Sequence, residues 1–383
     1  MNAYQTIVLS GGGSKGPYGL GVLLALDKYH KERAKQITKI YCGTSVGALN
    51  ATLAAQGDLD QLRTLYSEIR TRHILGTDRS TVTKLGMLWV LGRKPFHYFK
   101  NDALRATITK YVRFSALHDA HLLICATNYS TGELETFYIS RLIDEFIEQD
   151  QAQPLEKRRL INYHRIESQE HLVEALLAST AIPFYLPPVK IKKSLYVDGG
   201  VGNNTPLRQA AYISRFLGRR ADSQLEPTFC VINDPLRFTI DGAASNDIFG
   251  VIHRTMNIFH NELLNDSHIS WDRINQEVMN AQERKNLLES HIEGLEGLGE
   301  DVTAKLKEHV GQALRGTSSA TARLVLPLLI VRPSAPLVKD ILHFNPTNAK
   351  RLKEQGIADC LTCLEHKSFI THNDLRRWNE ELE

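Results

Sequence analysis

The chain has 383 residues, 42% of them hydrophobic and 23% charged, which is the composition of an ordinary globular protein with one large domain or two smaller ones. Its formal net charge of +3 is too small to indicate a nucleic-acid-binding protein. No window approaches the length of about 20 apolar residues that spans a bilayer, and no basic leader precedes an apolar run. We therefore expect a cytoplasmic or peripheral membrane protein without a signal peptide, and a leaderless export route stays open.

The elements expected in chain order alternate between strands and helices, which is typical of an α/β fold with a mostly parallel sheet. Strands are predicted at 6–10, 39–42, 122–127, 134–139, 228–232 and 324–331, with a further one ending at 197. Helices are predicted from Pro17 and Pro206, at 48–55, 58–72 and 172–177, and over much of 247–314. The turn 128–132 predicts a hairpin, and 141–170 an exposed helix and loop.

We expect a three-layer α/β/α architecture with helical insertions and no clear linker. Residues 5–235 are predicted to form the catalytic core, and 236–383 a mainly helical part that returns strand 324–331 to the same domain. The segment 75–100 combines apolar and aromatic residues with cations. It suits a lid or a lipid-facing surface, or alternatively a helix and loop packed on the core.

The five cysteines lie mostly in or near apolar stretches, and their odd number favours reduced, buried thiols. They are Cys42, Cys125, Cys230, Cys360 and Cys363. The last two form a CxxC pattern without the second pair of ligands that a zinc site requires, so two thiols on a C-terminal helix are expected there.

A G-x-S-x-G pattern spans Gly43 to Gly47, between a predicted strand and an Ala/Leu-rich helix. A nucleophilic serine on such a sharp turn leaves no room for side chains two residues before and after it. The turn would place Ser45 at a helix N-terminus, where free N–H groups favour developing negative charge. The pattern therefore predicts Ser45 as a nucleophile.

The glycine-rich run from Gly11 to Gly16 follows the first predicted strand. Consecutive glycines allow backbone N–H groups to approach a substrate closely, as an oxyanion hole requires. The run also fits G-x-G-x-x-G, but the second strand does not end in the acidic residue that a dinucleotide site needs. A Walker loop is excluded because Pro17 follows Gly16.

Asp198, followed by Gly199 and Gly200, ends a later predicted strand. A carboxylate at a strand end can reach a nucleophile on a neighbouring strand, although Asp-Gly is also a common plain turn.

These blocks, in this order, resemble the patatin-like phospholipase family of the bacterial type. The segment 178–183, with Pro187 and Pro188 behind it, looks like the family's small-residue and proline block, and 198–206 like its aspartate motif. The resemblance covers roughly 5–235.

The resemblance implies a phospholipase A-type acyl hydrolase with a Ser45–Asp198 dyad, an acyl-enzyme, and no metal or other cofactor. It further implies an oxyanion hole at Gly11, Gly12 and Gly13, with Lys15 in the loop's basic position. Its substrates would be acyl esters of glycerophospholipids, reached through peripheral membrane contact.

Two alternatives stay open at this level. One is an ordinary α/β-hydrolase with a Ser-His-Asp triad, for which His343 is the candidate. The other is an idle lipid-binding protein, or a regulated effector that a protein or small molecule activates. Headgroup preference, acyl position and oligomeric state are not encoded in any pattern that we recognise.

Overall fold

The computed structural model describes residues 2–34, 36–77, 99–153, 162–220, 223–235, 326–338 and 340–366, with helical pieces between 258 and 307. Most of the predicted lid, 78–98, lies outside the described residues, as does most of the predicted helical stretch 247–314. The described part of that stretch includes residues 273–280, which are helical as expected.

A mixed sheet forms the centre of the molecule, and within the described ranges it has ten strands. They are β1 (Asn2–Leu9), β2 (Ile37–Thr44), β3 (Leu122–Asn128), β4 (Leu134–Ile139), β5 (Tyr163–Arg165), β6 (Val189–Ile191), β7 (Ser194–Asp198), β8 (Ser223–Leu225), β9 (Thr228–Val231) and β10 (Leu328–Val331). The main order is β10-β9-β1-β2-β3-β4-β5. The pairs β10–β9, β9–β1, β1–β2, β2–β3 and β4–β5 are parallel, whereas β3–β4 is the predicted antiparallel hairpin.

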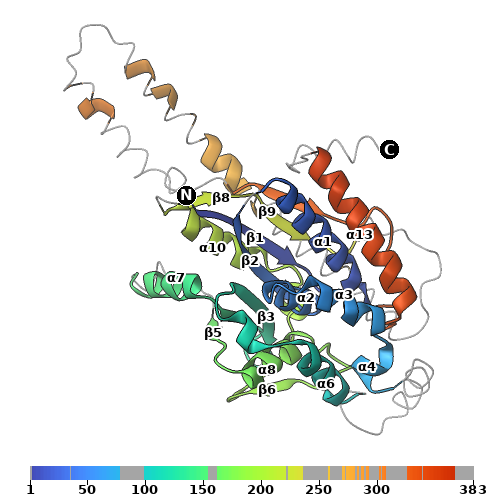
Figure 1. The fold of residues 1–383 in the computed structure, drawn as a ribbon. Coiled ribbons are helices and arrows are strands. Elements are labelled where there is room, and N and C mark those ends of the chain that lie inside the picture. The colour runs from blue at the N-terminus through green and yellow to red at the C-terminus, as the bar shows by residue number, and fades with distance from the viewer. Residues whose placement is uncertain are drawn as a thin grey trace.

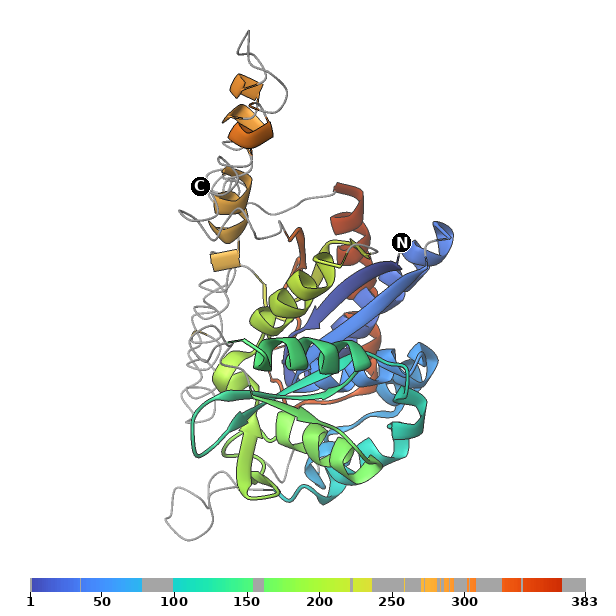
Figure 2. The same cartoon turned by 90° about the vertical axis from the view of Figure 1, so that its left-hand side faces the viewer.

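Helices cover both faces of this sheet. They are α1 (Gly16–Glu32), α2 (Val46–Ala55), α3 (Leu59–Glu68), α4 (Thr71–Leu75), α6 (Asp102–Tyr111), α7 (Arg141–Gln151), α8 (Gln169–Ser179), α9 (Gly200–Asn203), α10 (Leu207–Gly218) and α13 (Pro346–His366), with 3₁₀ turns η1 (Gly13–Lys15) and η2 (Phe114–Leu117). Figure 1 places α1, α2, α3 and α13 together on one side of the sheet. Figure 2, turned by 90°, shows α7 and α10 in front of the sheet, so the expected α/β/α layering is confirmed.

The alternation of β1 explains the two cores. Ile7 and Leu9 pack into the cluster that includes α1, whereas Val8 between them packs into the cluster on the α10 side. All three side chains are at most 1% exposed, as expected for a strand covered by helices on both faces. The C-terminal helix α13 lies so close to α1 that a side chain at Gly21 would overlap the carbonyl of Lys353.

Three expected elements differ in the structure. The helix predicted over 58–72 is two helices, because Ile69 and Arg70 are extended and Thr71 donates its N–H to the Phe344 carbonyl. The last strand is shorter than the predicted 324–331: Pro327 precedes β10, which starts at Leu328. Finally, the segment expected to be helix and loop, 141–170, also contains the short strand β5 on the edge of the sheet.

Candidate active site

Ser45 lies on the sharp turn between β2 and α2. Its backbone has φ 56° and ψ −128°, a strained conformation for a residue with a side chain. A Cβ at Gly43 would lie 2.4 Å from the Gly47 carbonyl oxygen, and one at Gly47 would lie 2.2 Å from that of Leu9. The two glycines therefore remove the clashes that this turn would otherwise create, which is the reason the sequence pattern requires them.

The base candidate, Asp198, reaches this turn because β2 and β7 follow each other along the same side of β3. Thr44, the last residue of β2, pairs with Cys125, and Asp198, the last residue of β7, pairs with the next residue, Ala126. The parallel strand β2 and the antiparallel strand β7 thus end at the same point. This register brings the Asp198 carboxyl beside Ser45.

The carboxyl of Asp198 is buried, with the residue 5% exposed. Its Oδ1 accepts a hydrogen bond of 2.7 Å from the Gly200 N–H. Burial raises the pKa of Asp198 to about 7, while hydrogen bonds from the Ser45 hydroxyl and the Gly200 N–H partly oppose this rise. Oδ2 has no partner in regular hydrogen-bond geometry, so the contact with Ser45 is looser than an ordinary hydrogen bond, as is common before substrate binds.

Ser179, at the end of α8, links Ser45 to strand β3. Its hydroxyl accepts the Ser45 N–H at 2.9 Å and donates to the Cys125 carbonyl at 2.6 Å. Its own carbonyl accepts the Gly199 N–H at 3.3 Å. One buried residue thus joins the serine turn, β3 and the aspartate turn; the sequence indicated its block, 178–183, but not this role.

The glycine loop lies next to Ser45, but its N–H groups are not equivalent. Gly11 already donates its N–H to the Asn204 carbonyl at 3.1 Å. Gly12 and Gly13, with φ of 158° and 55°, make no backbone N–H hydrogen bond to any part of the chain that the structure describes. Gly13 also lines the pocket that contains Ser45. Two of the three expected donors are therefore available to an oxyanion.

Lys15 is buried and forms an ion pair with Asp234, which follows β9. The adjacent Asn233 donates from Nδ2 to the carbonyls of Ser10 and Gly11, at 2.9 and 3.0 Å. Asp234 and Asn233 therefore hold the glycine loop against the segment that follows β9. Sequence reasoning missed both, although a carboxylate and an amide directly after a buried strand were the available signal.

An apolar pocket of about 570 Å³, a volume that includes space open to solvent, lies beside Ser45. Its walls come from α2, α3, α4 and α6 and from two loops, 182–186 and 342–344. Leu342 and Phe344 lie far outside the glycine, serine and aspartate blocks, and no sequence pattern assigned them to the site. Ile341 and Asp340 next to them accept hydrogen bonds from the N–H and hydroxyl of Ser14, at 2.7 and 3.0 Å.

The remaining predicted residues occupy supporting places. Gly16 begins α1 and its carbonyl accepts from Asn50. His343, the triad candidate, lies between two pocket-lining residues, and its Nε2 is 3.4 Å from the Asn345 side chain. All five cysteines are free thiols, and Cys360 and Cys363 lie on α13.

The described residues also limit metal and membrane-spanning arrangements. Within them, no group of three or more His, Cys, Asp or Glu side chains is arranged to hold a metal ion. In the same part of the chain, every helix is too short or too polar to cross a bilayer.

A three-layer α/β/α fold with a strained serine and a buried carboxyl beside an apolar pocket has the construction of a lipid hydrolase. The sequence pattern of the Patatin-like phospholipase family matches residues 7–211, more than half of the chain. The chain belongs to this family.

Two known proteins give the context of this assignment. A cGAMP-activated phospholipase of Pseudomonas aeruginosa is 27% identical over 248 residues, a match that spans 64% of this chain and 66% of that relative. This chain thus covers slightly less than two thirds of the relative's length. The crystal structure of VipD from Legionella pneumophila aligns with 94% of this chain and 67% of its own, at 13% identity and a TM-score of 0.39.

Proposed function

We propose that this protein is a phospholipase A-type acyl hydrolase that uses Ser45 as nucleophile and Asp198 as base. The observation that supports this most directly is the buried carboxyl of Asp198 beside the strained Ser45, at an apolar pocket. Since its pKa is raised to about 7, this carboxylate is a better proton acceptor than an ordinary aspartate and is still largely ionised slightly above neutral pH.

The reaction has two halves. Ser45 Oγ attacks the ester carbonyl carbon while Asp198 takes its proton, and the negative oxygen is stabilised by the N–H groups of Gly12 and Gly13. The tetrahedral intermediate expels the lysolipid alcohol, which leaves with the proton from Asp198. Water, deprotonated by Asp198, then attacks the acyl-enzyme, and the proton returns to Ser45 as the fatty acid leaves.

The pocket suits a fatty acyl chain. Its lining is aliphatic and aromatic apart from few polar groups near Ser45, so a hydrocarbon chain is desolvated there without burying charge. Polar ester and headgroup atoms would stay near Gly13 and solvent. Glycerophospholipids therefore fit this site better than water-soluble esters.

We also infer that a small molecule controls the activity. The Pseudomonas relative is named for activation by cGAMP, and the glycine loop here is bonded to the segment 340–344, which lies outside the family match. A ligand that displaces this segment would change both the loop and the pocket wall. Fatty-acid release should rise at least tenfold with cGAMP; equal rates with and without it would contradict the inference.

The decisive experiment measures fatty-acid release from mixed phospholipid vesicles. Ser45→Ala and Asp198→Asn should each lower the rate by several orders of magnitude, because each removes a group that takes part in bond making. The matched controls Ser67→Ala and Asp60→Asn, at exposed positions of α3, should keep the native rate. If a histidine substitution such as His343→Ala lowered the rate as far as Ser45→Ala, a triad would replace the dyad.

A further inference from the structure

The chain segments that carry α4 and α6, next to the pocket, are rich in cations. Within residues 70–77 and 99–113, six are Lys or Arg and only Asp102 is acidic, whereas the whole chain has a net charge of only +3. This short region therefore has more excess positive charge than the entire protein.

Half of these cations are already paired with acidic side chains from other segments. The pairs are Arg105 with Glu170 at 2.5 Å, Lys110 with Glu68 at 3.1 Å, and Arg113 with Asp58 at 3.2 Å. The other three cations, Arg70, Arg72 and Lys100, are exposed and have no acidic partner in the part of the chain that the structure describes.

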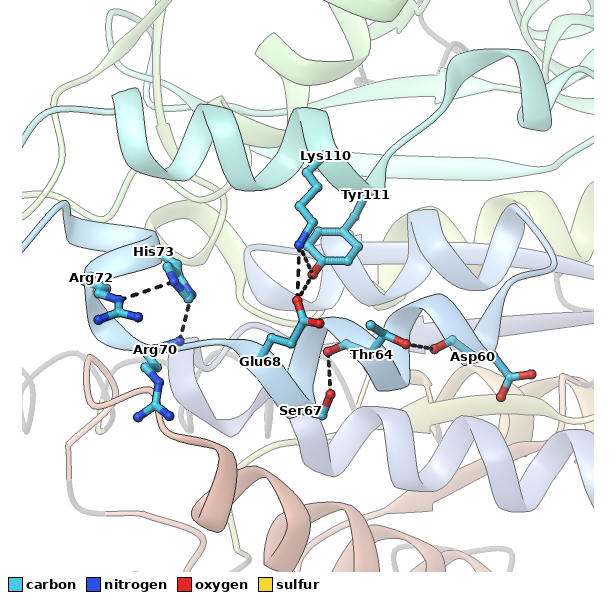
Figure 3. A network of polar contacts seen from close by, with 9 residues as sticks. All are labelled: Asp60, Thr64, Ser67, Glu68, Arg70, Arg72, His73, Lys110 and Tyr111. Carbon is cyan, nitrogen blue, oxygen red and sulfur yellow. Dashed lines mark hydrogen bonds and ion pairs between the residues drawn. The ribbon is translucent and has the colours of Figure 1, made fainter.

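His73 does not neutralise its neighbours either. Its Nδ1 accepts the Arg70 backbone N–H at 3.2 Å, and Arg72 Nε lies 3.4 Å from its Nε2. Whichever ring nitrogen accepts, an imidazole carries no negative charge, so His73 leaves the charges of both guanidinium groups uncompensated. In Figure 3 the Glu68 carboxyl faces Lys110 and Tyr111. The guanidinium groups of Arg70 and Arg72 lie on the other side and point away from Glu68. The two arginines are therefore open to an external anion.

All three cations without an acidic partner among the described residues lie in segments that also supply or contact pocket-lining residues. Arg70 follows Ile69, which lines the pocket, and Arg72 lies on α4, the helix that supplies Ile74 and Leu75. Lys100 follows Phe99, whose N–H donates to the carbonyl of the pocket residue Tyr185 at 3.0 Å. Since Gly76 at the end of α4 lies against Ala103 of α6, these positions belong to one end of the molecule.

We propose that Arg70, Arg72 and Lys100 form a docking surface for the anionic headgroup face of a lipid bilayer. The cations are long, exposed side chains on separate segments without a buried polar cradle, so they fit a broad charged surface better than a single bound phosphate. Docked there, the bilayer lies next to the acyl pocket. The proposal rests on the proposed function for its purpose, but binding can be measured without hydrolysis.

The test uses the full chain with Ser45→Ala, so that the vesicles stay intact. Binding to phosphatidylcholine vesicles is compared with binding to vesicles in which one third of the lipid is phosphatidylglycerol. Each cation near an anionic surface adds about 1 kcal/mol, or about fivefold. The triple variant Arg70→Gln, Arg72→Gln, Lys100→Gln should therefore bind anionic vesicles roughly 100-fold more weakly, with binding to phosphatidylcholine unchanged.

The matched control is Lys28→Gln, Arg33→Gln, Arg219→Gln, which removes the same charges from exposed positions at the ends of α1 and α10. It should bind as the unmodified chain does. The proposal is overturned if native binding ignores lipid charge, if the control loses as much as the triple variant, or if the triple variant binds normally. Failure of the proposed function would appear separately, as absent fatty-acid release from chains with Ser45 intact and normal charge-dependent binding.

Discussion

The buried carboxyl of Asp198 makes the free energy of unfolding depend on pH in a way that one substitution can isolate. Asp198 has an ordinary pKa of 3.8 in the unfolded chain and about 7 in the fold. Between these values the unfolded chain ionises while the folded protein keeps its proton, so the free energy of unfolding falls as the pH rises. Below 3.8 and above 7 the two states hold the same number of protons at this site, and its contribution is constant.

The size of this effect follows from a shift of about three pKa units at about 1.4 kcal/mol each, which gives about 4 kcal/mol in total. Roughly 2–3 kcal/mol of it falls between pH 5 and 8. Asp198→Asn keeps the acceptor for Gly200 but does not ionise. Its stability relative to the native protein should therefore rise by that amount across this range.

Urea unfolding at pH 5, 6, 7 and 8 measures the difference directly. The control is Asp60→Asn, at an exposed carboxylate. It shows how far replacing an aspartate changes the free energy of unfolding when the side chain is not buried. A difference between Asp198→Asn and native protein that stays flat from pH 5 to 8, or falls, would refute a buried carboxyl with a raised pKa.

Other predictions concern the site and its supports. Ester hydrolysis should rise tenfold per pH unit below about 7 and level off above it, because the Asp198 carboxylate is the proposed base; a midpoint near pH 4 would contradict that role. Asp234→Asn should cost about 3–5 kcal/mol in urea unfolding by leaving the Lys15 ammonium buried alone, and adding Lys15→Met should restore most of it. Ser179→Ala should lower kcat at least tenfold with little change in KM, since the Ser45 turn loses its anchor, and an unaltered kcat would count against this. Phe344→Ala should raise kcat/KM for long acyl esters relative to short ones, by up to about tenfold, in a chain-length series.

The sharp turn at Ser45 could be predicted from the sequence because its steric requirements are local. The spacing of Gly43, Ser45 and Gly47 follows from contacts within a few residues, and the preceding strand and following helix were visible as patterns. Asp198 could be suggested from its strand end, but its position beside Ser45 depends on both strands sharing β3. That register is a tertiary property.

What sequence reasoning missed depends on contacts between distant segments. The break at Ile69 and Arg70 coincides with hydrogen bonds between Thr71 and the segment around Phe344, more than 270 positions later in the chain. The Gly11 N–H is taken by a carbonyl of the aspartate turn, which no pattern within the glycine loop could reveal. Local sequence patterns therefore predicted the turns that carry polar side chains better than the contacts that distant segments make with them.

The pocket wall formed by Leu342 and Phe344 lies more than 100 positions beyond the end of the family match at residue 211. If the proposed function holds, the groups that break the ester bond and part of the wall that contacts the acyl chain come from separate stretches of the sequence. Recombination or insertion in the later stretch can alter which acyl chains are accepted while the reactive groups stay intact.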